Sequence, residues 1–470
     1  MKFKFLNITY LLLIGWVFNM PVVEAQDVTD TIRFTLNEAK AYALTNNKTI
    51  IASQMDVEIA KRKVRETVTI GLPQLNLDGS YQHIFDVPSF GIPVSGLTTE
   101  DFGFDGVNYN ILREASDPGG YLATYTLDGP SLPIMEQDNA TFDFKVSQLI
   151  FSGEYIVGLQ ASKVYKTISE QNLTKNKLDV MQQVEGTYYM LLVFKENLSI
   201  VKKNKELTSQ TLAEMKAMFE QGFIEDTELD QLQLNLTRLT NLEISLNGQI
   251  KNTLNLLKYQ LGMDYAQPLD VVDSISDFIR NLPPVYNDQF DINQNIEYQM
   301  VTNQVEVSKL NLRREKSTFL PVIAGFYNHQ ERWKSPAFDL QPKDIAGISL
   351  TLPLFTSGQR LFKVKQASID LDKSEVQKTQ LNEGLQLKYQ NKLLDYETAY
   401  NSYLNEKDNS EISEKIFNKT NVKYKEGMVS SLDLTQVQIQ YLTAVNEYYT
   451  SVLKLLNTKS EIDRLLSKNQ

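Results

Sequence analysis

Residues 148–153 read Gln-Leu-Ile-Phe-Ser-Gly, and residues 352–358 read Leu-Pro-Leu-Phe-Thr-Ser-Gly. The last glycines of these two stretches lie 205 positions apart. Gly222 and Gly427, which end Phe-Glu-Gln-Gly and Tyr-Lys-Glu-Gly, share that offset of 205. A constant offset between similar motifs indicates an internal duplication. Each copy is expected to run helix, strand, strand, long helix, glycine turn, helix.

The first strand of each copy is expected to begin at a Leu-Pro pair. Residues 71–75 read Gly-Leu-Pro-Gln-Leu and residues 319–323 read Phe-Leu-Pro-Val-Ile, which places the two prolines 248 positions apart. This offset is larger because the first copy carries an insertion between its strands, residues 86–139. The insertion's 54 residues hold 7 Gly, 5 Pro, nine acids and one base, a composition that predicts a loop. The matching loop of the second copy, roughly 330–344, is far shorter.

A long helix is expected after each pair of strands. The stretch from Glu154 to about Phe219 contains no proline, and its apolar residues recur at spacings of three, four and seven. Its 66 residues would form a rod of roughly 100 Å at 1.5 Å per residue. A partner stretch, 227–261, carries its own leucine stripe and ends before Gly262. Residues 358–424 are again free of proline, so each copy is expected to contain a helical hairpin.

The strands distinguish a soluble coiled-coil protein from a membrane protein. Leu75, Leu77 and Tyr81 alternate with polar residues, and the segments 141–147 and 346–352 alternate in the same way. A period of two with one polar face suits a barrel with lipid outside and water inside. A soluble strand with one wet face gives the same local pattern. The expected strand at 322–328 alternates poorly and adds little support.

The mature chain is not expected to cross a membrane with helices. Downstream of Gln26 there is no run of 18 or more apolar residues, so only a closed β-barrel could span lipid. Four strands cannot enclose a usable lumen, because eight already give an interior that side chains can fill. The chain is therefore expected to contribute to a barrel shared among several copies, whose number does not follow from composition or periodicity.

The N-terminus predicts a secretory signal peptide, residues 1–25. Two lysines precede an apolar stretch from Tyr10 to Phe18, and Val-Glu-Ala at 23–25 offers a cleavage site. A retained N-terminal anchor is the alternative. The chain has no cysteine, which excludes a disulfide framework, a thiolate metal site and a lipid-bearing cysteine. Its net charge of −11 argues against nucleic-acid binding.

These patterns give an expected organisation for the whole chain. After the signal peptide, a first repeat spans 26–262, a linker spans 263–287, and a second repeat spans 288–470. The first repeat is expected to hold strands at about 72–85 and 140–151 and a long helical hairpin at 153–262, and the second to hold strands at about 320–330 and 345–355 and a hairpin at 358–467.

Taken together, the motifs resemble those of the outer-membrane efflux protein family typified by TolC. The resemblance rests on the Leu-Pro strand starts, on the Phe-Ser-Gly and Phe-Thr-Ser-Gly strand ends, and on the turn glycines Gly222 and Gly427. The opening Phe-Thr-Leu-Asn-Glu-Ala at 34–39, followed by Asn46 and Asn47, is also typical. The duplicated order of these motifs covers essentially the whole mature chain.

The resemblance implies a homotrimer in the outer membrane of a Gram-negative cell, with a large periplasmic portion. The fold class would be mainly α with a membrane β portion: an internally duplicated α-helical coiled-coil barrel, and four strands per protomer in a shared, twelve-stranded trimeric β-barrel. Implied partners are a periplasmic adaptor (membrane fusion) protein, an inner-membrane pump and outer-membrane lipid, with no cofactor. The implied function is a passive exit duct of a tripartite efflux or type I secretion system.

By the same resemblance, the two helical turns are the principal functional sites. Gly222 and Phe223 in the first repeat, and Gly427 and Met428 in the second, would form hairpin tips that contact the adaptor. In relatives the tube narrows at these tips to a periplasmic mouth.

Three acids are expected at this mouth. Asp433 lies six residues after Gly427, where relatives carry an acid that lines the pore, and Glu228 with Asp226 nearby is the equivalent in the first repeat. Copies in three protomers would form rings of negative charge that favour cations. The alternative is that Glu228 and Asp433 stabilise helix N-termini by facing the helix dipole.

A tyrosine latch is also implied. Tyr424, three residues before the second glycine, matches a family tyrosine that bonds the first repeat's acid, here Glu228. The chain departs from the family at two further latch positions, which hold Val429 and Gln436.

Catalysis is not expected. His83 and His329 are the two histidines, and each is read as a polar residue that lines the pore or its rim. The sequence has no nucleotide-binding loop, no His/carboxylate metal motif and no serine motif in a strand-turn-helix setting. Two other classes of protein remain as rivals: a secreted coiled-coil scaffold or adhesion protein without a pore, and a surface hydrolase with helical additions. The cargo of a duct does not follow from the sequence.

Overall fold

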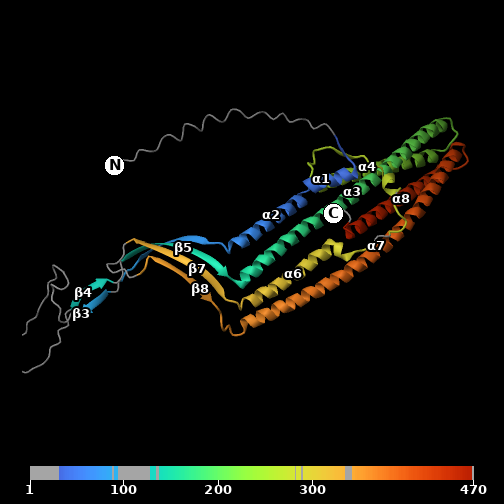
Figure 1. The fold of residues 1–470 in the computed structure, drawn as a ribbon. Coiled ribbons are helices and arrows are strands. Elements are labelled where there is room, and N and C mark those ends of the chain that lie inside the picture. The colour runs from blue at the N-terminus through green and yellow to red at the C-terminus, as the bar shows by residue number, and fades with distance from the viewer. Residues whose placement is uncertain are drawn as a thin grey trace, which may run out of the picture. The chain divides into compact units, whose positions relative to one another are not determined.

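The computed structural model describes residues 31–86, 89–93, 128–133, 137–280, 282–286, 289–333 and 341–467. The expected signal peptide, residues 1–25, lies outside these ranges, as does most of the insertion at 86–139. The described chain is mainly helical, with a small sheet (Figure 1). None of its helices combines the length and the apolar character that crossing a membrane requires.

The elements follow the expected order of helix, paired strands and helical hairpin, twice. The helices are α1 (Leu36–Asn46), α2 (Lys48–Thr69), α3 (Gly153–Glu220), α4 (Asp226–Leu261), α5 (Ile275–Ile279), a 3-10 turn (Ile292–Gln294), α6 (Ile296–Ser317), α7 (Gln359–Lys425) and α8 (Ser431–Leu465). The strands are β1 (Ile32–Phe34), β2 (Gln74–His83), β3 (Ser89–Pro93), β4 (Asp128–Pro133), β5 (Asp138–Phe151), β6 (Leu269–Val271), β7 (Val322–Trp333) and β8 (Asp344–Thr351).

The chain divides into two compact units that cut across the sequence repeats. The sheet unit comprises residues 58–168 and 302–378. The hairpin unit comprises the described parts of 1–57, 169–301 and 379–470. Each unit therefore takes residues from both halves of the chain.

The sheet unit contains a four-stranded antiparallel sheet in the order β2-β5-β7-β8 (Figure 1). Its central strands, β5 and β7, come from different repeats. The sequence-based ranges of 72–85, 140–151, 320–330 and 345–355 compare with 74–83, 138–151, 322–333 and 344–351 in the structure.

Part of the insertion is also β-structure. β3 and β4 pair antiparallel, with a register shift between Gly91 and Pro93. The expectation that the whole of 86–139 is loop was therefore wrong for these two strands. Glycine and proline interrupt regular secondary structure, but they also occur in short edge strands and at bulges. The number of these residues in 86–139 therefore could not exclude a β-hairpin.

The two faces of the four-stranded sheet differ in polarity. Because successive side chains of a strand point to opposite faces, the register assigns each residue to one of them. One side, here called the apolar face, carries exposed Leu75, Leu77, Phe142 and Ile348. The opposite, polar face includes Ser80 and Thr141, whose hydroxyls lie 2.8 Å apart, and also Asn76, Asp78, Lys145, Asn328 and Ser349.

The hairpin unit is organised around a buried core near the chain's N-terminal helices. Tyr188 of α3 is fully buried, and its hydroxyl oxygen lies 2.9 Å from both the Phe34 carbonyl oxygen and Asp273 Oδ2, the two acceptors of its one hydrogen. The same Asp273 oxygen accepts from the backbone amide of Leu36 (2.7 Å), which ties the start of α1 into the core. This core draws on α1, α3, α4, α8 and the segment from β6 to α5, including Ala39, Val184, Leu191, Leu257, Leu261, Leu269, Val271, Ile275, Val452 and Leu456.

Within the segment 263–287, expected as a linker, β6 and the start of α5 pack into this core. β6 pairs in parallel with β1, matching Ile32 with Leu269 and Phe34 with Val271. The sequence offers little warning of this, because strands of three residues carry no measurable periodicity.

Candidate functional site at the paired helical turns

The two helical turns adopt the same backbone geometry. Gly222 and Gly427 have φ values of +79° and +71°, in the left-handed region that glycine enters at little cost. In the first turn, the Gly222 amide donates to the Phe219 carbonyl (2.8 Å) and the Phe223 amide to the Met218 carbonyl (3.0 Å). This pair of bonds is a Schellman motif, which satisfies carbonyls at the end of α3.

The second turn repeats the motif after α7. The amide of Gly427 donates to the Tyr424 carbonyl and that of Met428 to the Lys423 carbonyl, each at 2.9 Å. A Cβ at either glycine would meet nothing within 4 Å, so the positive φ and not lack of space requires glycine.

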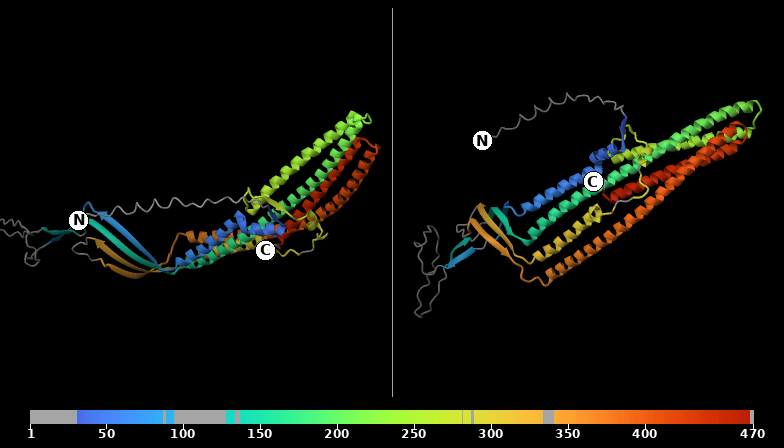
Figure 2. Two further views of the ribbon diagram at one scale, coloured as in Figure 1. Left: turned by 90° about the horizontal axis from the view of Figure 1, so that it is seen from above. Right: turned by 45° about the vertical axis from the view of Figure 1, so that its right-hand side comes forward.

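The two turns pack against one another through a small apolar cluster. Met215 of α3, Leu232 of α4, Phe417 and Tyr424 of α7, and Leu434 of α8 are all buried in it. Figure 2 shows in both views that the α3–α4 turn (green) and the α7–α8 turn (red) lie at the same end of the hairpin unit. The sequence-predicted turn residues of both repeats are therefore brought together.

The tips of both turns expose apolar side chains. Phe223 is 71% exposed and Met428 is 67% exposed. Asp226 is exposed in the first turn of α4, and it makes no hydrogen bond or ion pair with the described residues.

Asp433 caps its own helix. Ser430 is the N-cap of α8; its hydroxyl accepts from the Asp433 amide, and its own amide and hydroxyl donate to Asp433 Oδ2 at 3.2 and 2.7 Å. This reciprocal arrangement is a capping box. The bonds from Ser430 hold the pKa of the Asp433 carboxyl below its usual value.

Glu228 caps the same helix from the other hairpin. Its Oε2 accepts from the backbone amide of Ser431, the first residue of α8, at 2.9 Å. Ser431 is fully buried, and its hydroxyl donates to Gln231 Oε1 of α4 at 2.7 Å. Two carboxylates thus converge on the N-terminus of α8, as the helix-dipole alternative requires.

Tyr424 does not make the hydrogen bond implied by the family resemblance. Its side chain is only 4% exposed, and its hydroxyl has no hydrogen-bond partner among the described residues. Burial, together with the negative charge of Glu228, raises the pKa of Tyr424 to about 12. The two groups are neighbours, but the Glu228 carboxylate is directed to the Ser431 amide instead.

A buried polar layer lies behind the turns and was not anticipated from the sequence. The Gln438 side chain of α8 is 2% exposed, and its Oε1 accepts from Asn235 of α4 (2.6 Å). Its Nε2 donates to Asn204 and Thr208 of α3 at 3.1 and 3.2 Å. These contacts satisfy the amide of Gln438 on both sides and link the two hairpins at one register. Polar residues on helices look like solvent-facing positions in a sequence, so pattern alone does not reveal this layer.

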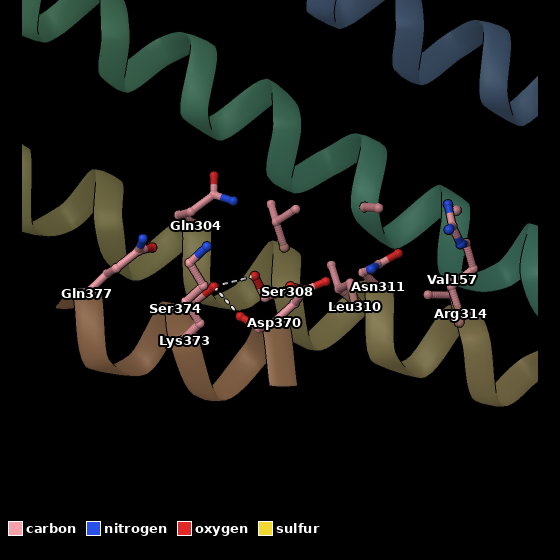
Figure 3. A pocket seen from close by; sticks show the side chains of 13 residues that line it. Val157, Gln304, Ser308, Leu310, Asn311, Arg314, Asp370, Lys373, Ser374 and Gln377 are labelled. Atoms are coloured by element: carbon pink, nitrogen blue, oxygen red, sulfur yellow. Dashed lines mark hydrogen bonds between the residues drawn. The ribbon is translucent and has the colours of Figure 1, made fainter. Parts of the chain in front are cut away.

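The sheet unit contains a separate pocket of about 440 Å³ between α3, α6 and α7 (Figure 3). Ser374 Oγ donates to the Asp370 carbonyl, and the hydroxyls of Ser374 and Ser308 lie 2.8 Å apart. The lining also includes the charged residues Asp370 and Lys373. In the described ranges, moreover, no group of three or more His, Cys, Asp or Glu could hold a metal ion.

The histidines, read as isolated polar residues, are each paired. His83 Nδ1 lies 2.7 Å from Asp138 Oδ1, and His329 Nδ1 lies 2.7 Å from Asp344 Oδ1. Each aspartate also accepts a hydrogen bond from a tyrosine hydroxyl, Tyr81 for Asp138 and Tyr327 for Asp344.

Comparison with solved structures places this architecture among outer-membrane channels. The chain aligns with CusC over 93% of its own length and 92% of that chain, at 14% identity and a TM-score of 0.71. It also aligns with the CmeC outer membrane channel of Campylobacter jejuni over 92% of its own length and 85% of that chain, at 17% identity and a TM-score of 0.67. With the open state of the MtrE outer membrane channel of Neisseria gonorrhoeae, the alignment covers 92% of this chain and 88% of that chain, at 14% identity and a TM-score of 0.68.

No family model and no curated protein matches the sequence. At such low identities the structural likeness shows the fold. The chain has the fold of these channels, mainly helical with a small β portion, and the fold class expected from the sequence is confirmed.

Proposed function

We propose that this chain is one protomer of a homotrimeric exit duct in the outer membrane of a Gram-negative cell. The duct would passively conduct substrates delivered from the periplasmic side, and the chain would not act as an enzyme. The observation that carries the proposal is the near-complete alignment, over 93% of this chain, with a solved transmembrane channel of the same fold.

The sheet supports a shared barrel in this proposal. Its outer strands, β2 and β8, have no further strand beside them in the described chain, and β2 is exposed along its whole length. Unpaired strand edges are costly in lipid, because their backbone groups have no water to bond. Pairing β2 of one protomer with β8 of the next would satisfy both edges, and three protomers would give twelve strands.

The two faces of the sheet suit a barrel that separates lipid from an aqueous lumen. Exposed Leu75, Leu77, Ile348 and Leu350 would face lipid, while the opposite row, with Asn76 and Ser349, would face the aqueous lumen. A soluble protein of this size would be expected to cover an apolar face of this extent.

The hairpin tips support a partner in the periplasm. We assign Gly222, Phe223, Gly427 and Met428 to the contact with an adaptor protein, because the tips present exposed apolar side chains on a rigid, twice-repeated turn. An inner-membrane pump would then supply the energy, in a tripartite efflux or a type I secretion system.

The acids at the turns are assigned to the mouth of the duct. Asp433, Glu228 and Asp226 lie at the helix starts beside the tips, and Tyr424 packs next to Glu228. The capping bonds of Asp433 and Glu228 are compatible with a second role as a charged ring, since a capping carboxylate keeps its charge.

The proposal is tested by extracting the protein from outer membranes in mild detergent. The expected result is a trimer that dissociates only on heating and that forms ion-conducting pores in planar bilayers. A chain that is a stable monomer in plain buffer, with no conductance, would instead identify a pore-less secreted scaffold and overturn the proposal.

A further inference from the structure

A cluster of three polar side chains closes the first hairpin of the sheet. Tyr81 donates its hydroxyl to Asp138 Oδ1 at 2.8 Å, and His83 Nδ1 lies 2.7 Å from the same oxygen. His83 is the last residue of β2 and Asp138 is the first of β5, so the cluster sits on the last pair of the ladder.

The second hairpin carries the same cluster. Tyr327 donates to Asp344 Oδ1 at 2.6 Å, and His329 Nδ1 lies 2.7 Å from that oxygen. His329 and Asp344 again form the last pair of their ladder, between β7 and β8. The chain has two histidines, and both occupy this arrangement. The two sets are called the Tyr–His–Asp clusters below.

The second ring nitrogen of each histidine, Nε2, lies outside the bond to the aspartate, and its surroundings differ between the clusters. An ionised carboxylate only accepts hydrogen bonds, so the hydrogen between it and the ring is on Nδ1. Nε2 of His83 has no partner among the described residues, and the imidazole is 37% exposed. Nε2 of His329 lies 3.5 Å from Glu331, whose carboxylate also pairs with Lys343 at 3.1 Å.

The clusters lie on the apolar face of the sheet. Side chains two apart on a strand share a face, so His83 and Tyr81 lie in the row of Leu77 and Leu75. In the same way Asp344 heads the row that continues through Ala346, Ile348 and Leu350. A run of exposed apolar residues therefore ends, in both hairpins, at a hydrogen-bonded polar cluster.

The distance along the strands fits the thickness of a membrane. His83 lies ten residues after Pro73, and His329 lies eight after Pro321, where the two strands begin. At about 3.3 Å per residue and a tilt of roughly 40°, these runs rise about 20–25 Å. The apolar band of outer-membrane barrels is about 25 Å tall.

Resting on the duct proposed above, we propose that the two Tyr–His–Asp clusters mark the outer headgroup level of the membrane. There, Nε2 of His83 and the neighbouring side chains of His329 and Glu331 contact the polar headgroups of lipid. Within each cluster the carboxylate is satisfied by two hydrogen bonds, which lowers the cost of keeping an acid at the end of a lipid-facing row. In the first cluster, Nε2 of His83 is then the polar atom that remains for the lipid. In the second cluster, Nε2 of His329 shares this place with the Glu331 carboxylate.

Aromatic residues beside the clusters agree with this level. Tyrosine and tryptophan gather at membrane–water interfaces, where one end of the side chain is apolar and the other wet. Tyr81 is 68% exposed, and Trp333, which lies four residues beyond His329 at the end of β7, is 73% exposed. Phe85 packs edge-on against His83.

Trp333 provides a direct measure of depth. The chain has two tryptophans, Trp16 and Trp333. The substitution Trp16→Phe leaves Trp333 as the one fluorescent tryptophan, whether or not the N-terminus is cleaved. This protein is reconstituted as full trimers into phosphatidylcholine bilayers whose acyl chains are brominated either near the headgroup or near the chain end. Shallow bromine is expected to quench Trp333 at least about twofold more than deep bromine.

Variants then test the histidines themselves. The double change His83→Phe with His329→Phe replaces the headgroup contacts with apolar rings, so Trp333 should move deeper and the quenching ratio should fall toward one. His83→Gln with His329→Gln keeps a polar tip at each position and should preserve the ratio. Ile348→Phe, within the apolar row, is the control and should also leave the ratio unchanged.

The outcomes separate this inference from the function on which it rests. Absence of quenching by either lipid would mean that the protein does not insert, and both proposals would fail. Insertion with stronger quenching by deep bromine would place the clusters inside the apolar band and overturn the headgroup level alone. The phenylalanine double variant could also form trimers with an unchanged ratio of shallow to deep quenching. The clusters would then only join neighbouring strands, and the inference would again be overturned.

Discussion

The hydroxyl of Tyr424 is a buried polar group without a hydrogen-bond partner among the described residues. The ring fills the cluster between Phe417 and Leu434, so its apolar part is well used. Its hydroxyl, however, is left without a partner while Glu228 bonds the Ser431 amide. Such an unsatisfied buried hydroxyl costs roughly 1–3 kcal/mol.

Replacing this tyrosine with phenylalanine should not destabilise the hairpin unit. Tyr424→Phe removes the unpaired hydroxyl and keeps the ring, so unfolding of the helices should be unchanged or shifted upward by about 1 kcal/mol. Tyr188→Phe is the matched control: its hydroxyl oxygen lies 2.9 Å from two acceptors, and its loss should cost about 1–2 kcal/mol. Helical circular dichroism during denaturation in detergent measures both. A loss for Tyr424→Phe as large as that of the control would show that its hydroxyl is bonded in the assembled protein.

At the scale of the elements, the two turns are rigid caps rather than loose loops. Each ends its helix with the same pair of backbone bonds, and α8 then starts under a capping box and a second carboxylate from α4. The polar layer of Gln438 fixes the register of α8 against α3 and α4 a few turns away. The tips are therefore held in position before any partner binds.

Alanine at the turn glycines should weaken this end of the molecule. Gly222→Ala and Gly427→Ala each place a Cβ at a φ above +70°, which should cost about 1–2 kcal/mol by backbone strain alone, since no atom lies within 4 Å. Gly248→Ala, in the interior of α4 and equally free of neighbours, should instead stabilise by up to about 1 kcal/mol. Thermal unfolding of the three variants tests the contrast. If the unfolding temperatures of all three variants shift in the same direction, the backbone conformation of the glycines does not explain the change in stability.

For the molecule as a whole, the sequence predicted the repeated helices and strands but missed contacts that involve only a few residues. The duplicated order of strands and long helices follows from the 205-residue offset and from long proline-free stretches such as 154–219, because many residues share in those patterns. The fold class itself was implied by the resemblance of these motifs to a known family. The pairing of β1 with β6 depends on three residues a strand, and the Gln438 layer on four polar side chains, too few for periodicity to register. The turn acids were found by position, but whether Glu228 bonds Tyr424 or Ser431 depends on side-chain geometry that no spacing fixes.

In the proposed trimeric duct, the charges of the turn acids would lie around one mouth. Three copies of Asp433 and Glu228 around one mouth would favour cations, so Asp433→Asn with Glu228→Gln should lower cation selectivity, seen as a reversal potential closer to zero under a salt gradient in planar bilayers. Both amides keep an acceptor oxygen for the caps at Ser430 and Ser431, so the change removes charge while the helix start stays bonded. Glu66→Gln, an exposed acid of α2 paired with Lys63, is the control and should not move the reversal potential. Open pores of the double variant with the original selectivity would restrict these carboxylates to capping α8.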